Sequence, residues 1–305
     1  MAKLERFFEL KAPPMDVIDR LWKGSIDMHL HLAPDPTVSR RVDGYQAALS
    51  AKESGMRTIV LKSDFYPTAP VAAAVRSAVP EFECFGALNM EYITTGGFGP
   101  HAAEAVEQSA KMGAKVLWMP TFDAWYARKY IPGKEGTGLR ILDDRGEKIP
   151  EVWETLKRVL DTVAKYDMVL ANGHISYEET VVLFEEAKKY GVKKLVATHP
   201  MSDVIWPAMT MEQMKHLADM GAYIEHVFRN FLPLLGSYDP SLYVEAVKEI
   251  GAERTIMSTD LAQSTDCMPA DGMRMFIGNM LEYGCTEEEV ELMAKVNPAR
   301  LLGLL

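Results

Sequence analysis

The sequence predicts an α/β protein built as a closed barrel of eight parallel strands, each followed by a helix. Short, continuous apolar segments of strand length recur along the chain, and amphipathic segments of helical length separate many of them. Strands that are apolar on both faces are typical of parallel sheets covered by helices. Eight such units fit the (β/α)8 or TIM barrel better than an open doubly wound sheet, because no GxGxxG turn follows the first strand.

The predicted strands share a high content of Val, Ile, Leu and aromatic residues. They are IDMHLHL (26–32), TIVLK (58–62), ECFGALN (83–89), KVLWMP (115–120), MVLANGH (168–174), KLVATH (194–199), AYIEHVF (222–228) and TIMSTD (255–260).

The clearest helical patterns lie between these strands and end in a glycine, which is a common helix stop. They cover residues 42–55, 101–113, 178–191 and 210–221. Thr210 with Gln213, and Thr286 with Glu289, have the spacing of capping boxes at helix N-termini.

The strand and helix units predict a single domain over residues 1–305. Two segments of this domain lie outside the units. Residues 1–25 precede the first strand and are expected to pack across the bottom or side of the barrel. Residues 121–150 form an insertion after the fourth strand, with a hairpin turn at Asp144-Arg145-Gly146. Long insertions after barrel strands lie over the C-terminal mouth, so we expect a lid that contributes side chains to a pocket.

Composition limits the classes of function. The 305 residues carry 33 basic and 43 acidic side chains, a net charge of −10, which argues against a broad nucleic-acid-binding surface. No apolar run is long enough to cross a membrane. The three widely spaced cysteines form neither a disulfide framework nor a CxxC metal motif, and they fit the reducing cytoplasm, the predicted location.

Four histidines and one aspartate fall where they can meet. His29 and His31 alternate on the first strand and therefore share a face. His174, His199 and Asp260 end the fifth, sixth and eighth predicted strands. In a closed barrel all five converge at one end, and imidazoles with a carboxylate are good ligands for Zn²⁺ or a similar divalent ion.

The HLH of the first strand, the histidines of strands five and six, the STD of strand eight and the C-terminal NPARLLGL resemble the amidohydrolase superfamily. The resemblance implies metal ligation by His29, His31, His174 and Asp260, with His199 beside the substrate or as a ligand of a second ion. The sequence departs from the binuclear members, because no lysine ends strand four. Glu91, after strand three, is an alternative bridging ligand.

The resemblance also implies an activity. A metal-dependent hydrolase would cleave a C–N or C–O bond of an amide, lactone, ester or cyclic amide by way of an activated water. Zinc is the first expectation for one or two ions, with manganese, iron or nickel as alternatives. Asp260 would move the proton, His199 would orient water or stabilise an oxyanion, and Lys62, at the end of strand two, would supply positive charge.

Residues on strand ends and in the lid are candidates for substrate binding, and their cations favour a small anionic molecule. The predicted residues are Trp118, Arg128, Tyr130, Arg140 and His226, with Asp64, Glu225 and Arg229 also near the mouth. Alternatives within the enzymes are a decarboxylase or other lyase of the same superfamily and a phosphoesterase. The alternative outside the enzymes is a metal-binding scaffold. The expected partner is a small-molecule substrate, and by analogy with the family the chain forms a homo-oligomer.

Overall fold

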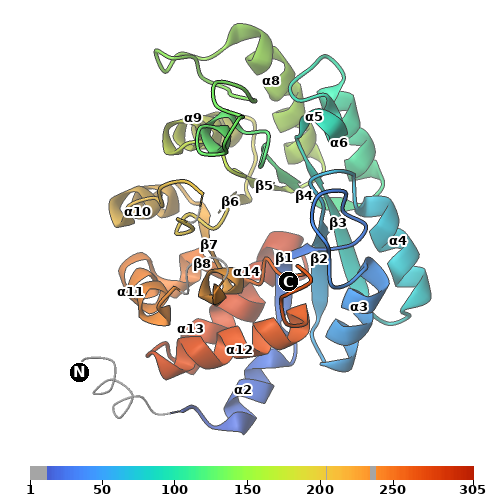
Figure 1. The fold of residues 1–305 in the computed structure, drawn as a ribbon, viewed down its shortest axis with the longest axis vertical. Helices are drawn as coiled ribbons and strands as arrows, with labels where there is room; N and C mark the ends of the chain where they lie inside the picture. The colour runs from blue at the N-terminus through green and yellow to red at the C-terminus, as the bar shows by residue number, and fades with distance from the viewer. Residues whose placement is uncertain (1–11, 204, 234–237) are drawn as a thin grey trace.

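The fold is a ring of parallel strands surrounded by helices, seen in the computed structural model of residues 12–203, 205–233 and 238–305 (Figure 1). The eight strands pair in sequence order, each parallel to the next. They are β1 (Ile26–His31), β2 (Thr58–Lys62), β3 (Glu83–Asn89), β4 (Ala114–Trp118), β5 (Val169–Ala171), β6 (Leu195–Ala197), β7 (Tyr223–Val227) and β8 (Thr255–Ser258). The predicted (β/α)8 barrel is confirmed, with every strand in its expected segment.

Hydrogen bonds just beyond β8 join it to β1 and close the ring. The amide of Asp260 donates to the carbonyl of His29 at 2.8 Å, and the amide of His31 donates to the carbonyl of Leu261 at 3.0 Å. Closure leaves no sheet edge between the first and last strands. It also places residues from opposite ends of the chain side by side at the C-terminal mouth.

One helix connects each strand to the next, and shorter turns fill the remaining loops. The connecting helices are α3 (Gly44–Glu53), α4 (Ala69–Ala78), α6 (Ala102–Lys111), α8 (Pro150–Lys165), α9 (Tyr177–Lys189), α10 (Met211–Asp219) and α11 (Pro240–Ile250). The others are α2 (Met15–Trp22), α5 (Tyr92–Thr95), α7 (Trp125–Arg128), η1 (Phe228–Phe231), η3 (Ala252–Arg254), α12 (Pro269–Glu282), α13 (Glu287–Glu291), the π-helical η4 (Leu292–Val296) and α14 (Asn297–Leu302).

The predicted helix signals are present in the structure. Capping boxes form at Thr210 with Gln213 and at Thr286 with Glu289. Across the part of the chain that the structure describes, no helix is long and apolar enough to span a bilayer.

Alternating side chains divide the core into two layers. Inward-facing residues such as Val60, Val116 and Ile256 fill the barrel, while Leu61 and Leu117 pack outward against the helices. The register of β1 shifts between Asp27 and Leu30. An irregularity of this kind lets a strand change the face that it presents. Ile26 and Met28 therefore belong to the interior cluster, and His29 and His31 still reach the cavity at the mouth of the barrel.

The insertion between β4 and α8 contains α7 and the predicted hairpin. Leu142 bridges Lys148 in antiparallel fashion, and the Asp143 amide donates to the Glu147 carbonyl at 2.8 Å. The amide of Ile141 donates to the buried Glu179 carboxylate of α9 at 2.8 Å. These bonds hold the insertion against the outside of the barrel.

The N-terminal segment lies against the helices that follow β8. Asp19 of α2 accepts from Arg274 of α12 at 2.8 Å, and Arg20 pairs with Glu287 of α13. The expectation that residues 1–25 pack on the barrel also covers residues 1–11, which lie outside the described residues.

Gly86 of β3 tests the packing of strand on helix. A Cβ atom there would lie 2.3 Å from the Cα of Ala69, at the start of α4. Because backbone must move to relieve that contact, we expect Gly86→Ala to lower the free energy of unfolding by about 2–4 kcal/mol in urea titrations. Gly278→Ala in α12 is the control, since its Cβ would meet only Ile18 at 3.4 Å and alanine favours helix. Equal effects of the two substitutions would contradict this account.

Candidate metal centre

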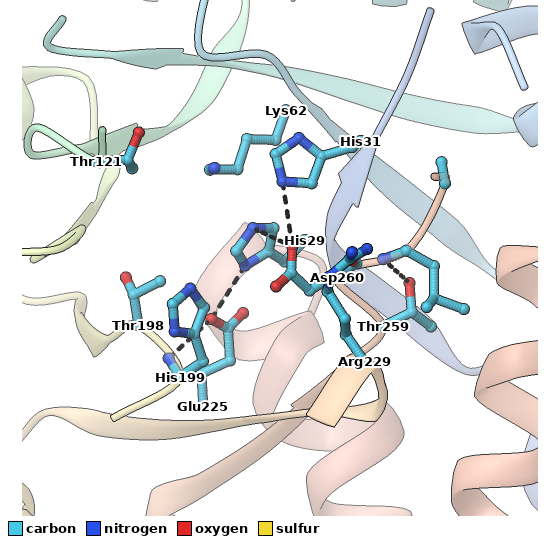
Figure 2. Close-up of polar contacts among 12 residues, drawn as sticks. His29, His31, Lys62, Thr121, Thr198, His199, Glu225, Arg229, Thr259 and Asp260 are labelled. Carbon is cyan, nitrogen blue, oxygen red and sulfur yellow. Dashed lines mark hydrogen bonds and ion pairs between the residues drawn. The ribbon is translucent and has the colours of Figure 1, made fainter. Parts of the chain in front are cut away.

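The five predicted ligands border one cavity at the C-terminal mouth of the barrel. Each side chain comes from β1 or from the loop after β5, β6 or β8. They are His29, His31, His174, His199 and Asp260. Figure 2 shows both β1 imidazoles turned toward Asp260, with His199 and Glu225 on the other side of His29. The sequence therefore placed these residues together correctly, and their roles as ligands remain a prediction.

Three of these residues form a compact donor set. One ligand atom from each of His29, His31 and Asp260 lies within 4.8 Å of the others. Asp260 Oδ1 is 3.2 Å from His29 Nε2 and 3.1 Å from His31 Nε2. The three atoms thus face a common centre, as the ligands of a divalent ion do.

Glu225 fixes the orientation of His29. The Oε2 atom of Glu225 is 3.1 Å from His29 Nδ1 and also accepts the amide of His199 at 3.3 Å. A proton on Nδ1 leaves the Nε2 lone pair turned to Asp260. That Nε2 has no hydrogen-bond donor or acceptor partner among the described residues, apart from the facing carboxylate. A carboxylate behind a histidine is the usual arrangement around a metal-binding imidazole.

His174 and His199 form a second pair beside this set. Their Nε2 atoms are 3.2 Å apart, and the ring of His199 stacks on His29 with centroids 5.7 Å apart. In the residues that the structure covers, both Nδ1 atoms are buried without a hydrogen-bond partner. The pair can bind the same ion as His29 or a second one, so both alternatives from the sequence stay open.

Burial and neighbouring charges set the protonation of the cluster. Burial lowers the pKa of His31 to about 3, with Lys62 adding to the effect, and burial also lowers the pKa values of His174 and His199. Burial opposes ionisation of Asp260, but His29 and His31 hold the pKa of this carboxyl well below its usual range. Neutral imidazoles and an ionised carboxylate are the forms that bind metals.

His29 is the exception. Although burial disfavours its cation, the carboxylates of Asp260 and Glu225 raise the pKa of His29. A positive charge is therefore favoured between these two acids, and a proton or a metal ion can supply it. The nitrogen and oxygen donors fit zinc, and they fit manganese, iron or nickel as well.

Lys62 belongs to a buried polar network next to His31. Its ammonium is 3.0 Å from Asp64 Oδ1, which also accepts from Thr121 Oγ1 at 2.8 Å. The Thr121 hydroxyl also contacts Glu91 Oε1. One hydroxyl proton cannot serve both carboxylates, so a proton on Glu91 completes the chain. Burial, and secondly the Asp64 carboxylate, raises the pKa of Glu91 to about 8.

The structure corrects most of the predicted substrate contacts. His226 points away from the barrel interior and stacks on Tyr243 with centroids 4.3 Å apart, because side chains alternate along β7 and Glu225 takes the inward position. Trp118 is buried inside the barrel, 5.4 Å from the ring of His29, and does not line the cavity.

The lid residues also lie elsewhere. Arg128 pairs with Asp123, Arg140 pairs with Asp144, and Tyr130 is 41 % exposed next to Tyr126. Local partners within the insertion therefore account for these side chains. Of the insertion's described residues, Phe122 alone lines the cavity that holds the five predicted ligands.

Residues that sequence reasoning missed form the cavity walls. They come from the loops after β1, β4, β6, β7 and β8, and are Val38, Arg40, Phe122, Ser202, Ile205, Trp206, Asn230 and Gln263. Their position in loops after barrel strands was the available signal. No spacing within those loops distinguishes a wall residue from a solvent-exposed one.

A barrel of this kind, with histidines and an aspartate at the strand ends, is the class that the sequence resembles, and solved structures share its fold. The probable dipeptidase PvdM from Pseudomonas aeruginosa is 11% identical, with a TM-score of 0.64 over 95% of this chain and 97% of that one. An amidohydrolase from the same organism is 12% identical, with a TM-score of 0.60 over 95% and 98%. The 2,6-dihydroxybenzoate decarboxylase from Rhizobium is 15% identical, with a TM-score of 0.54 over 92% and 99%.

These likenesses, at 11–15% identity, show a shared fold. The chain belongs to DUF6282, a family of unknown function whose model matches residues 24–225. No curated protein matches the sequence. The matched range includes His29, His31, His174 and His199 but ends before Asp260.

The donor set predicts bound metal. We expect protein purified without chelator to contain about one equivalent or more of zinc, manganese, iron or nickel per chain. His29→Ala and His31→Ala should each lose most of it, because each removes one of the three converging atoms. His216→Ala on α10 is the control, since His216 is exposed and contacts Tyr177. Mass spectrometry of the metals measures the result. A metal-free protein, or equal loss in all three variants, would contradict the site.

Glu91 predicts a pH dependence of stability. Its pKa is about 8 in the folded chain and near 4.5 when unperturbed, so between these values the folded state binds more protons. The contribution of this carboxyl to the free energy of unfolding therefore falls as the pH rises between these two pKa values, by up to about 1.4 kcal/mol per pH unit. Glu91→Gln removes the titration. In urea titrations from pH 5 to pH 8, the stability of the wild type should fall relative to the variant. A constant difference would refute the assignment.

Proposed function

We propose that this protein is a divalent-metal-dependent hydrolase that cleaves a C–N or C–O bond of a small anionic molecule. The observation that carries the proposal is the convergence of His29, His31 and Asp260 on one centre at the mouth of the barrel. Active sites of (β/α)8 enzymes occupy this end. The fold neighbours include an amidohydrolase and a probable dipeptidase, which agrees with hydrolysis.

The proposed ligands are His29, His31 and Asp260, with His174 and His199 completing the set or binding a second ion. Zinc is the expected ion, because imidazole nitrogens and carboxylate oxygens are common ligands of zinc in proteins. Such an ion would act as a Lewis acid and would make water a better nucleophile near neutral pH. The remaining chemistry falls to the side chains of the cavity.

Asp260 is the proposed proton carrier. Its carboxylate is ionised, because His29 and His31 lower its pKa, and its side chain is 14% exposed to the cavity. It can accept a proton from the attacking water and deliver it to the leaving nitrogen or oxygen. Asp260 lies two residues beyond the end of β8 and has a left-handed backbone, with φ of 54°, a conformation that is often found at functional sites.

His199 and Lys62 are the proposed stabilisers of negative charge. The Nδ1 atom of His199 has no hydrogen-bond partner within the described ranges, so it is free to donate to a substrate oxygen or to orient water. Lys62 lines the cavity and remains paired with Asp64, which fixes the position of its ammonium. Both groups would favour an oxyanion over a neutral carbonyl.

A lyase is the second candidate. The cations Arg40, Lys62 and Arg229 at the cavity would also hold a carboxylate that is to be released as CO₂. The fold neighbour from Rhizobium is a decarboxylase. The two reactions differ in whether water enters the product.

The experiment is a screen of small amides, esters, lactones and cyclic amides, run in ¹⁸O-labelled water with zinc-loaded protein. Hydrolysis should place ¹⁸O in the acid product. Asp260→Asn should lower kcat by about 10²–10⁴-fold, because it removes the proton carrier. Metal content is measured in parallel, so that loss of the ion is separated from loss of the base.

Glu212→Gln on the exposed face of α10 is the control and should keep full activity. Release of CO₂ without ¹⁸O in the organic product would replace hydrolysis by decarboxylation. Full activity of Asp260→Asn with its metal bound would refute the role of Asp260. Full activity after complete metal removal would refute the proposed function.

A further inference from the structure

The cations that line the cavity are arranged so that their charge faces inward. Arg40, Lys62 and Arg229 all border the cavity. Each is paired with a carboxylate, and those partners are Asp35, Asp64 and Asp266. None of these acids belongs to the cavity lining of the described chain. Each pair therefore contributes its cation, and not its acid, to the lining of the cavity.

Arg229 has unused binding capacity. The residue is 5 % exposed, and its Nη1 is 3.0 Å from Asp266 Oδ2 and 3.4 Å from the carbonyl of Asp260. Its Nη2 is buried and lacks a hydrogen-bond partner in the portion of the chain that the structure describes. A buried guanidinium nitrogen without an acceptor is costly, and an anionic ligand would satisfy it.

Arg40 contributes a second donor from the loop after β1. Its contacts with Asp35 use Nε, at 2.8 Å, and Nη2, at 2.6 Å, so the pairing does not involve Nη1. Asp35 is also held by the amides of Thr37 and Val38 at 2.9 Å each. This arrangement anchors Arg40 at the cavity wall before any ligand binds.

Another part of the cavity lining is apolar. Phe122, Ile205 and Trp206 come from the loops after β4 and β6, and the Trp206 ring packs against His174 at an angle of 42°, with centroids 4.4 Å apart. The cavity thus combines a cationic wall, an aromatic wall and the proposed metal ligands at its base. A ligand that satisfies all three surfaces carries an anionic group and an apolar body.

We propose that Arg229 and Arg40 form a carboxylate-binding subsite beside the metal ligands, and that the substrate is a small carboxylic acid whose apolar body contacts Phe122, Ile205 and Trp206. This assignment rests on the proposed hydrolase, because it names the substrate class of the same cavity. Guanidinium groups suit a carboxylate, since paired N–H donors match its two oxygens. The contact of Arg229 with the Asp260 carbonyl places the anion close to the reacting group.

The test measures binding without turnover. Benzoate and phenylacetate are titrated calorimetrically against the full chain, each with its neutral amide as the matched probe, in metal-free and in zinc-loaded protein. In metal-free protein we expect each acid to bind at least about tenfold more tightly than its amide. Arg40→Gln and Arg229→Lys should each reduce the affinity for the acids about tenfold and leave the affinity for the amides unchanged.

Two features keep the variants interpretable. Asp35 retains its backbone donors in Arg40→Gln, and Arg229→Lys retains a cation for Asp266, which also accepts the amides of Ala262 and Gln263 at 3.1 and 2.7 Å. Arg158→Gln on α8, whose arginine pairs with Glu104 at the surface, is the control and should bind like the wild type.

Several results would overturn the subsite. The first is equal affinity for acid and amide in metal-free protein, and the second is the absence of acid binding in both metal-free and zinc-loaded protein. The third is acid binding that requires zinc and is unchanged by both substitutions, because the carboxylate then binds the metal. Failure of the proposed hydrolase appears differently. In that case the charge preference and its loss in the variants persist while no bond is cleaved.

Discussion

The closure of β8 against β1 is the constraint on which the candidate site depends. The hydrogen bond from the Asp260 amide to the His29 carbonyl, at 2.8 Å, joins the two strands at the level of the proposed ligands. Next to it, Asp27 accepts from the amide of Thr259 at 3.0 Å and from its hydroxyl. These bonds fix the register of β8 against β1. The carboxylate of Asp260 therefore meets both imidazoles of β1, although the two strands lie at opposite ends of the chain.

Many buried charged groups surround this contact at the mouth of the barrel. Isolated buried ions are expensive, and a buried pair often stabilises a fold less than apolar residues of the same size would. Three buried pairs that place the cation, but not the acid, in the cavity lining are therefore better explained by ligand binding than by stability. The acids Glu225 and Asp260 on either side of His29 favour a cation there in the same way.

The sequence was sufficient for the architecture because parallel strands buried on both faces leave a simple signal. All eight strands and the glycine-terminated helices lie where the apolar runs and helical patterns indicated. The histidines and Asp260 could be grouped for the same reason, since the carboxyl ends of barrel strands meet at one mouth. His174 lies three residues beyond the end of β5, and the grouping holds because the loop stays at the mouth.

The incorrect predictions concern side chains whose position depends on tertiary contacts rather than on the periodicity of the sequence. His226 was expected in the pocket, yet the alternation of β7 gives the inward position to Glu225. Arg128 and Arg140 were expected at the mouth, but Asp123 and Asp144 bind them within the insertion. Arg40 and Trp206 line the cavity from irregular loops that carry no period. Loop side chains are placed by tertiary contacts, which a single sequence does not encode in its spacing.

The proposed site requires that one divalent ion binds between the first and last strands of the barrel. Anomalous diffraction at the zinc edge, from crystals of protein grown with zinc and without chelator, tests it directly. We expect a peak about 2.0–2.2 Å from His29 Nε2, His31 Nε2 and an Asp260 oxygen, with His174 or His199 as further neighbours. Zinc bound only at surface residues, with the three side chains in direct contact and no peak between them, would contradict it.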